Sequence, residues 1–478
     1  MTRLPHALLA ASLLAACGGS GDDAVTPDSS HPADADTRDI AARLGDLPGV
    51  TVTETPRIKA PPGYRYFVLQ VTQPVDHAAP DGATFQQEVS LIHKDVTAPM
   101  VLFTTGYDDF NLDDPSEPTG LLSANQISVE YRYFGTSRPA TPDWSKLTIK
   151  QMADDEHAIV ELLKPIYGAK WISTGGSKGG MTASYHHRFY PDDVAGTLAY
   201  VAPMSFSVPD ARYGTFLAAD GTQPCADNVR AVAKEMLQNR RAALLTRAQA
   251  QATAQNIAYT RIAIAPALES AILDLEFTYW QYNGVASCSD VPAVTATDDA
   301  LYSFLDTYSG VPFSADDVTA EFDAYFYQAY AELGSPGTVA VRGDQVAPDI
   351  KALAQFTEAD YAGSFPIGAP TPTFDPTAME DIKGYVASSE ASHFIFEYGE
   401  YDPWTAGAYD ITGATDTIEV TAPQGTHNNG LFALSTADRA AAIAMLAAWT
   451  GVTPAPTPPA SLLGPSRVRP GIHRRHGL

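Results

Sequence analysis

Basic residues and cysteines are scarce in this chain of 478 residues. Lys and Arg number 30 against 56 Asp and Glu, which gives a formal charge of −26 at pH 7. A charge of that sign repels phosphate, so we expect no nucleic acid partner. Only three cysteines occur, and no Cys and His spacing matches a zinc site. We therefore expect neither a metal nor a cofactor.

Long apolar runs are also missing, except near the N-terminus. Arg3 precedes an apolar stretch at 7–16, which is too short to cross a bilayer core of about 30 Å. This pattern predicts a signal peptide over 1–16. Leu-Ala-Ala-Cys at 14–17 resembles a bacterial lipobox, which implies that Cys17 carries a lipid. We expect an exported lipoprotein of the bacterial envelope that touches the membrane only through this lipid; a secretory signal with an unmodified Cys17 is the alternative.

Small and polar residues dominate 17–45, and the segment 452–478 holds six Pro, four Arg and no acidic residue. These compositions predict a flexible tether and a disordered basic tail. With Cys17 attached to lipid, Cys225 and Cys288 remain as an even pair in an oxidising compartment, so we expect a disulfide between them. Two buried free thiols are the alternative.

Strand and helix patterns alternate in two parts of the chain, 46–203 and 390–451. Strands are expected at 64–72, 84–93, 100–105, 127–131, 171–174, 197–201, 393–398 and 417–421, and helices at 148–167, 178–189 and 436–449. Such alternation predicts a mostly parallel sheet covered on both faces.

Strand patterns nearly vanish between 204 and 389. Helical patterns take their place at 228–254, 257–282, 300–308, 319–333 and 350–361. We interpret 204–389 as a helical cap domain inserted into the α/β domain.

The pentapeptide GGSKG at 175–179 has the form G-x-S-x-G. An expected strand leads into it and an expected helix leads out, as in a nucleophile elbow that presents Ser177. The helix start directs free N–H groups at the site, so the amide of Lys178 is a candidate oxyanion donor. The amide of Tyr107, in the loop after the strand at 100–105, is the second candidate. We expect the Lys178 side chain to point away from Ser177.

A serine nucleophile needs a base, and the base needs an orienting acid. The chain order Ser, acid, His is met by Asp402, after the strand at 393–398, and by His427, in a glycine-bounded loop after the next strand. The alternatives are Asp410 or Asp416 as the acid and His393 as the base. His393 precedes Asp402 in the chain and fits a structural histidine better.

Further local motifs accompany this constellation. They are QPVDH at 73–77, TFQQ at 84–87, VEYRYFG at 129–135, TGGSKGGMT at 174–182, YGEYDPW at 398–404 and GTH at 425–427. On these motifs the sequence resembles the peptidase family S37, the secreted tripeptidyl aminopeptidases of PS-10 type, and more distantly the prolyl carboxypeptidases. The resemblance implies an α/β-hydrolase fold, a helical cap before the catalytic acid, and Ser177, Asp402 and His427 as the triad. Tyr131 departs from it, because the family pattern has His there.

The resemblance also implies the activity, the release of tripeptides from peptide N-termini, often after proline. A carboxylate beside the cleft would then bind the α-amine of the substrate. Glu130 is a candidate, with a buried acid paired to Arg132 or another neighbour as the alternative. The aromatic segment 277–282 either lines a proline pocket or, as we favour, belongs to the cap core.

Three functions fit these observations. The first is a lipid-anchored serine exopeptidase that acts on peptides through an acyl-enzyme. The second is an esterase with the same triad, and the third is a non-catalytic peptide-binding lipoprotein. The intact set of Ser177, Asp402 and His427 disfavours the third, and the fold alone does not separate the first two.

Overall fold

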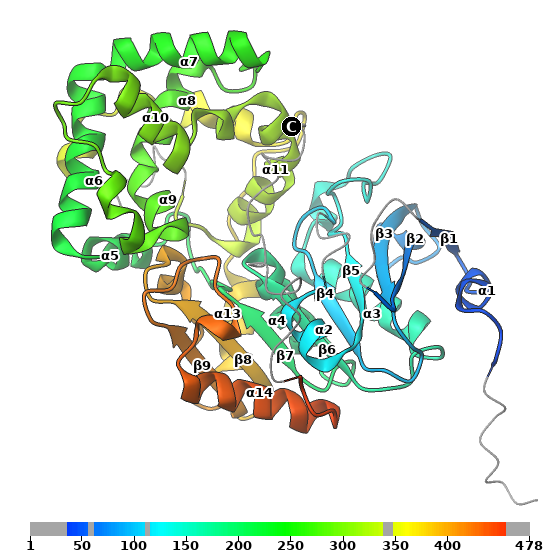
Figure 1. Cartoon of the computed structure of the whole chain (residues 1–478). Helices are drawn as coiled ribbons and strands as arrows, with labels where there is room; N and C mark the ends of the chain where they lie inside the picture. The colour runs from blue at the N-terminus through cyan, green and yellow to red at the C-terminus, as the bar shows by residue number, and fades with distance from the viewer. Residues whose placement is uncertain (1–35, 56–61, 110–114, 338–347, 456–478) are drawn as a thin grey trace, which may run out of the picture.

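A single nine-stranded sheet forms the base on which the rest of the molecule is built (Figure 1). The computed structural model describes residues 36–55, 62–109, 115–337 and 348–455. The expected signal peptide, Cys17, most of the tether and the tail beyond 455 lie outside these residues.

The sheet has the order β1-β2-β3-β5-β4-β6-β7-β8-β9. In chain order the strands are β1 (Val50–Glu54), β2 (Arg65–Pro74), β3 (Thr84–His93), β4 (Met100–Thr104), β5 (Asn125–Val129), β6 (Trp171–Gly176), β7 (Thr197–Tyr200), β8 (Ser392–Gly399) and β9 (Thr415–Ala422). In the order of the sheet, β1, β2, β3 and β5 pair antiparallel with one another. From β5 onward, through β4, β6, β7, β8 and β9, neighbouring strands pair parallel. All eight predicted strands are present, and β1 was missed.

Helices cover both faces of this sheet, because successive residues of a buried strand point to opposite sides. Phe394 and Phe396 of β8 pack against α4 (Lys178–Phe189) and α13 (Thr377–Val386). Ile395, between them, packs on the other side with α14 (Thr436–Thr450). The helix α3 (Ile149–Leu163) shares the face of α4, and α2 (Glu117–Leu122) shares that of α14. The predicted α/β fold with a two-sided sheet is confirmed.

The chain between β7 and β8 builds the helical cap at the upper left of Figure 1. Its helices are α5 (Arg212–Ala219), α6 (Gln223–Glu235), η2 (Met236–Arg240), α7 (Arg241–Gln255), α8 (Ile264–Leu273), α9 (Leu275–Tyr282), η3 (Gly284–Asp290), α10 (Asp298–Tyr308), η4 (Val311–Ser314), α11 (Asp316–Gln328), η5 (Ala329–Leu333), α12 (Pro348–Lys351) and η6 (Glu358–Ser364). Most of them enclose a hydrophobic core of their own around Trp280, whereas α11 and η5 pack with the sheet domain. The short elements η1 (Trp144–Lys146), η7 (Pro403–Gly407) and η8 (Leu431–Ala433) belong to the sheet domain.

Two predicted domain boundaries need correction. Residues 40–45 of the expected tether form the helix α1 (Ile40–Gly45), because Ile40 and Leu44 bury their side chains against the sheet domain. The helix α13, placed in the cap at 204–389, belongs to the sheet domain, since its apolar side chains pack beneath β8. The cap therefore ends before α13.

Helix extents in the cap also differ from the predictions. The segment 257–282 becomes helical only at Ile264, because Pro266 is tolerated in a first turn and would break a helix that ran through it. The segment 350–361 holds only the end of α12 and the start of η6. Within the described residues no helix is long and apolar enough to cross a membrane.

The expected disulfide joins Cys225 of α6 to Cys288 of η3, with a Cα–Cα distance of 5.5 Å. It ties together two cap segments whose cysteines are 63 residues apart in the sequence.

Replacing Cys225 and Cys288 together by Ala should lower the free energy of unfolding by about 4 kcal/mol, since the unfolded chain regains the entropy of a closed loop. Urea unfolding of both proteins, with and without reductant, measures this. Reductant should shift the midpoint of the wild type and leave that of the double variant in place. An unchanged wild-type midpoint would contradict a stabilising disulfide.

Candidate active site

Ser177 stands on a sharp turn between β6 and α4. Its backbone has φ 55° and ψ −126°, a conformation that costs energy for a residue with a Cβ atom. The Ser177 N–H donates to Tyr200 O of the neighbouring strand β7 at 2.9 Å, and α4 begins at the next residue. This is the strand, turn and helix that the sequence predicts for a nucleophile elbow.

Glycines are required on both sides of the serine because three backbone segments meet here. A Cβ atom on Gly175 would lie 2.5 Å from the carbonyl carbon of Gly179 and 2.6 Å from Thr104 O. A Cβ on Gly179 would collide with the same Thr104 oxygen. The turn is thus wedged against the end of β4.

His427 and Asp402 form the second part of the site. The Nδ1 atom of His427 lies 2.6 Å from Oδ2 of Asp402, and both side chains are buried. The other oxygen of Asp402 accepts the Trp404 N–H at 3.1 Å. These contacts fix the ring and place its proton on Nδ1, so that Nε2 is left as an acceptor.

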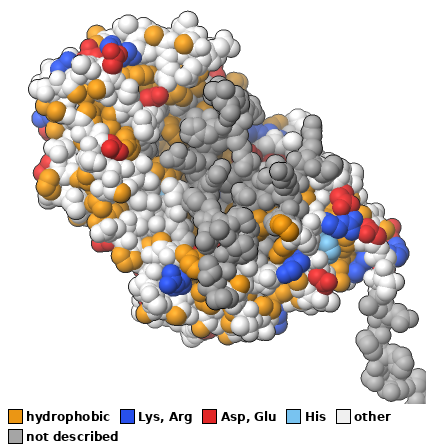
Figure 2. Space-filling view, viewed as in Figure 1, with side chains coloured by type: hydrophobic (Ala, Val, Ile, Leu, Met, Phe, Trp, Pro, Cys, Tyr) orange, Lys and Arg blue, Asp and Glu red, His pale blue; other side chains and the backbone are white. Residues whose placement is uncertain are grey.

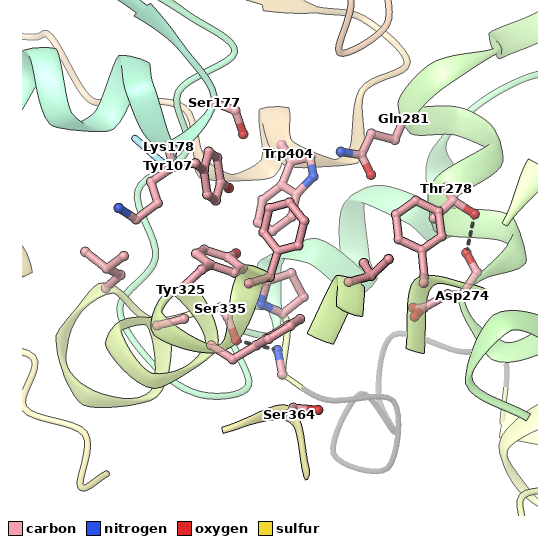
Figure 3. Close-up of a pocket in the computed structure, with 18 of the residues that line it drawn as sticks. Tyr107, Ser177, Lys178, Asp274, Thr278, Gln281, Tyr325, Ser335, Ser364 and Trp404 are labelled. Atoms are coloured by element: carbon pink, nitrogen blue, oxygen red, sulfur yellow. Dashed lines mark hydrogen bonds between the residues drawn. The ribbon is translucent and has the colours of Figure 1, made fainter. Parts of the chain in front are cut away.

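Ser177 and His427 line one cavity of about 300 Å³ between the sheet domain and the cap (Figure 3). His427 Nε2 is buried and has no hydrogen-bond partner among the described residues. Ser177 is 9% exposed, and its hydroxyl interacts with the Tyr107 side chain, whose pKa burial raises well above its ordinary value. In ligand-free enzymes the bond from the nucleophile to its base is often open, and it tightens with substrate.

The two candidate oxyanion donors also lie at this cavity. Lys178 is the first residue of α4, and Tyr107 follows the end of β4. Within the described part of the chain neither amide proton has a backbone or side-chain acceptor. Both amides thus retain the capacity to bind an oxyanion. The Lys178 side chain points away from Ser177, as Figure 3 shows, and its Nζ donates to Gly106 O.

The prediction that Glu130 binds the substrate amine is wrong, because this residue lies outside the cavity. Glu130 is 3% exposed and is not among the residues that line the cavity. Its carboxylate accepts the amide protons of Asp109, Thr136 and Ser137, and burial raises its pKa. The hydroxyls of Thr136 and Ser137 also donate to it. Glu130 therefore holds a turn in place as a buried acid paired to neighbours other than Arg132.

Arg132 belongs instead to a buried polar layer formed by the motifs at 73–77, 84–87 and 129–135. Its guanidinium binds both oxygens of Asp155 at 2.7 and 2.8 Å. His77 Nε2 lies 2.7 Å from the same carboxylate, and Gln73 donates to Gln87 at 3.0 Å. These signature residues stabilise the sheet domain and do not line the cavity.

The aromatic segment at 277–282 divides between two roles. Phe277, Tyr279 and Trp280 pack in the cap core, as we favoured. Gln281 and Tyr282 line the cavity, and the Tyr282 ring lies edge-on to His427 with centroids 6.0 Å apart. The alternatives His393 and Asp416 contact each other at 3.4 Å, and neither they nor Asp410 line the cavity.

Sequence reasoning missed most of the cavity wall. Aromatic side chains of α11 and of the segment after Asp402 line it: Phe322, Tyr325, Phe326 and Trp404. The acidic residues of the wall are Asp108 and Asp274. Figure 3 shows Asp274 at the opposite end of the cavity from Ser177. No signal in the sequence distinguishes these residues from ordinary core and surface positions.

One cluster has the ligand types of a metal site. One ligand atom from each of His157, Glu161 and Asp193 lies within 4.8 Å of the others. Lys164 Nζ lies 3.2 Å from Asp193 and already supplies a positive charge there. His157 and Glu161 belong to α3, Asp193 lies in the loop between α4 and β7, and none of the three lines the cavity.

Comparisons with known proteins agree with this geometry. The family model of PS-10 peptidase S37 matches residues 33–470. The chain is 37% identical over 460 residues to the prolyl tri/tetrapeptidyl aminopeptidase of Streptomyces mobaraensis, covering 95% of this chain and 93% of that protein. It is 30% identical over 220 residues to the lysosomal Pro-X carboxypeptidase of Mus musculus, covering 41% and 42%.

Among solved structures, the proline iminopeptidase of Mycobacterium smegmatis matches with 13% identity and a TM-score of 0.32. The match covers 80% of this chain and 98% of that one. The sheet order, the elbow and the cap insertion described above are those of an α/β-hydrolase fold. The chain belongs to the PS-10 peptidase S37 family and is a serine peptidase.

Proposed function

We propose that the protein releases short peptides, chiefly tripeptides and often after proline, from the N-termini of peptides. The observation that carries this is the roofed cavity that both Ser177 and His427 line. A cavity of about 300 Å³ accepts a small ligand and excludes a folded protein. The name of the Streptomyces relative, prolyl tri/tetrapeptidyl aminopeptidase, supports this choice of product.

The chemistry follows from the geometry of the three side chains. As the Ser177 oxygen attacks the scissile carbonyl, His427 Nε2 takes the hydroxyl proton. The Asp402 carboxylate stabilises the imidazolium through Nδ1, 2.6 Å away. His427 then gives the proton to the leaving amine, and the peptide remains as an ester on Ser177. Water, deprotonated by the same His427, hydrolyses this ester and restores the serine.

The cap supports selection of chain ends because it is joined directly to the catalytic loop. The His427 N–H donates to Gln281 O of α9 at 2.7 Å. The cap wall thus has a fixed position relative to the base, and the depth of the cavity limits how many residues lie on the amine side of the scissile bond.

We further propose that the mature chain is exported and anchored to the bacterial envelope by a lipid on Cys17. The support is the tetrapeptide Leu-Ala-Ala-Cys at 14–17 after a short apolar stretch. Such an anchor would place the peptidase where peptides from outside the cell arrive.

Wild-type protein should release p-nitroaniline from Ala-Ala-Pro-p-nitroanilide with a free N-terminus and not from the acetylated form. Replacing Ser177 by Ala should lower kcat by about 10⁶-fold, because the acyl acceptor is gone. Ser184→Ala is the matched control, since Ser184 lies on the same helix, its hydroxyl donates to Gly180 O, and it does not line the cavity.

Other outcomes would redirect the assignment. Cleavage of both anilides would indicate an endopeptidase. Cleavage of neither, with short acyl esters still hydrolysed, would favour the esterase, and no Ser177-dependent hydrolysis of any substrate would leave a peptide-binding protein.

Replacing Asp402 by Asn should lower kcat by about 10⁴-fold, because the amide stabilises the wrong imidazole tautomer. Steady-state kinetics of the anilide measure this. Asp416→Asn serves as the control, because Asp416 was the competing acid and lies outside the cavity. An equal loss in the two variants would contradict the assigned acid.

Replacing Cys17 by Ala should move the protein from the membrane fraction to the soluble fraction. Fractionation of cells grown with a radiolabelled fatty acid measures both location and lipid content. Label retained by the Cys17→Ala protein would sink the anchor assignment and leave the peptidase assignment intact.

A further inference from the structure

We propose that the side chain of Lys178 is a positioning residue of the oxyanion site, which aims the Tyr107 amide at the carbonyl oxygen under attack. The inference rests on the proposed acyl transfer at Ser177. It gives one residue two tasks: its backbone N–H is an oxyanion donor, and its side chain orients the other donor.

The first support is the contact between Lys178 and the loop that carries Tyr107. Lys178 is 2% exposed, and its Nζ lies 2.6 Å from Gly106 O. Gly106 O and the Tyr107 N–H belong to one peptide group. In a trans peptide these two bonds point in opposite directions. A carbonyl drawn toward the buried Nζ therefore turns the N–H toward the opposite side, where the cavity lies.

The rest of the loop is fixed by independent contacts. Tyr107 O accepts the Tyr131 N–H and the Thr105 hydroxyl, each at 2.8 Å. Gly106 has φ +76°, and a Cβ there would lie 2.5 Å from the Gly179 amide nitrogen. The loop is thus pressed against the first turn of α4. Without the lysine, the Gly106 carbonyl would be a buried acceptor with no donor, and the peptide would be driven to rotate.

The amine is itself held in place by aromatic rings. Its Nζ lies 3.1 Å from the centroid of the Tyr131 ring and 5.2 Å from that of Phe134. Burial lowers the pKa of Lys178 well below its ordinary value. Both the charged and the neutral amine have an N–H to donate, so the contact with Gly106 O survives either state.

Hydrogen bonds connect the Tyr131 ring that contacts Lys178 to helices at the base of the cap. The Tyr131 hydroxyl accepts from Gln328 Nε2 at 2.8 Å, and the same amide donates to Glu332 at 2.9 Å. Glu332 accepts the Ile149 N–H at 2.6 Å, and burial raises its pKa to about 7. Lysines are seldom fully buried. Here the contacts that run from α11 to α3 enclose the Lys178 side chain.

The test replaces Lys178 by Met, which keeps the length and apolar stem of the side chain and removes the donor. We expect kcat to fall by about 10²-fold on both the anilide and a p-nitrophenyl ester, because one of two oxyanion donors is misdirected. KM and the affinity for a product tripeptide should stay within about twofold. The affinity for a peptide aldehyde, which forms a tetrahedral adduct on Ser177, should fall in parallel with kcat.

Thr182→Val is the matched control, because it removes a buried hydrogen bond to the Lys178 carbonyl from the same helix without touching Gly106. The unfolding midpoint of Thr182→Val should shift by about as much as that of Lys178→Met, and its kcat should stay at the wild-type value. A Lys178→Met protein with kcat within threefold of wild type, or with kcat lost only in proportion to folded protein, would overturn the proposal. The ester keeps this test separate from the peptidase assignment, since any acyl transfer at Ser177 uses the same donors.

A second measurement does not depend on the folding of a variant. In a crystal structure of the wild-type protein with a peptide aldehyde bound, the hemiacetal oxygen should lie about 2.7 to 3.1 Å from both the Lys178 and the Tyr107 amide nitrogens. Nζ should stay on Gly106 O. An oxygen bound by the Lys178 amide and not by Tyr107 would refute the role of the side chain.

Discussion

The site depends on the close approach of three backbone segments: the end of β6, the first turn of α4, and the end of β4 with the loop at 105–107. Gly175 and Gly179 permit this approach, because a Cβ on either would meet Thr104 O. The approach holds Ser177 in its strained conformation at the edge of the cavity. It also brings the loop with Tyr107 beside the helix start, so that the nucleophile and both candidate oxyanion donors share one rigid unit.

The cap covers this unit without supplying its nucleophile, base or acid. Ser177, Asp402 and His427 all belong to the sheet domain, on segments that precede or follow the insertion. The cap contributes aromatic wall residues from α11 and the Gln281 carbonyl that accepts the His427 N–H. The helix α9 packs in the disulfide-tied core of the cap, whereas α11 packs through Ala324 and Tyr327 in the core of the sheet domain. The cavity wall is thus held by both hydrophobic cores.

Glu130 and Lys178 show where local patterns stop being informative. A carboxylate near a strand end is compatible with an amine-binding group, yet Glu130 is consumed by the amides of the turn that follows it. The elbow predicts that the Lys178 side chain points away from Ser177 but not where it goes; it is buried with its Nζ on Gly106 O, 72 residues away in the chain. The partners of Glu130 are set by the turn that follows it, and the partner of Lys178 is set by how the sheet brings β4 and β6 together.

The sequence by itself determined features that depend on neighbouring residues or on the order of residues along the chain. Residue periodicity specifies eight of nine strands, the glycines around Ser177 specify the elbow, and chain order selects Asp402 and His427. Tertiary structure alone decided the cavity wall, the carboxylate partners and the cap boundary at α13. The reason is that periodicity reports which face of an element is buried, whereas the residue that meets this face comes from a distant segment and is chosen by the packing of the whole fold.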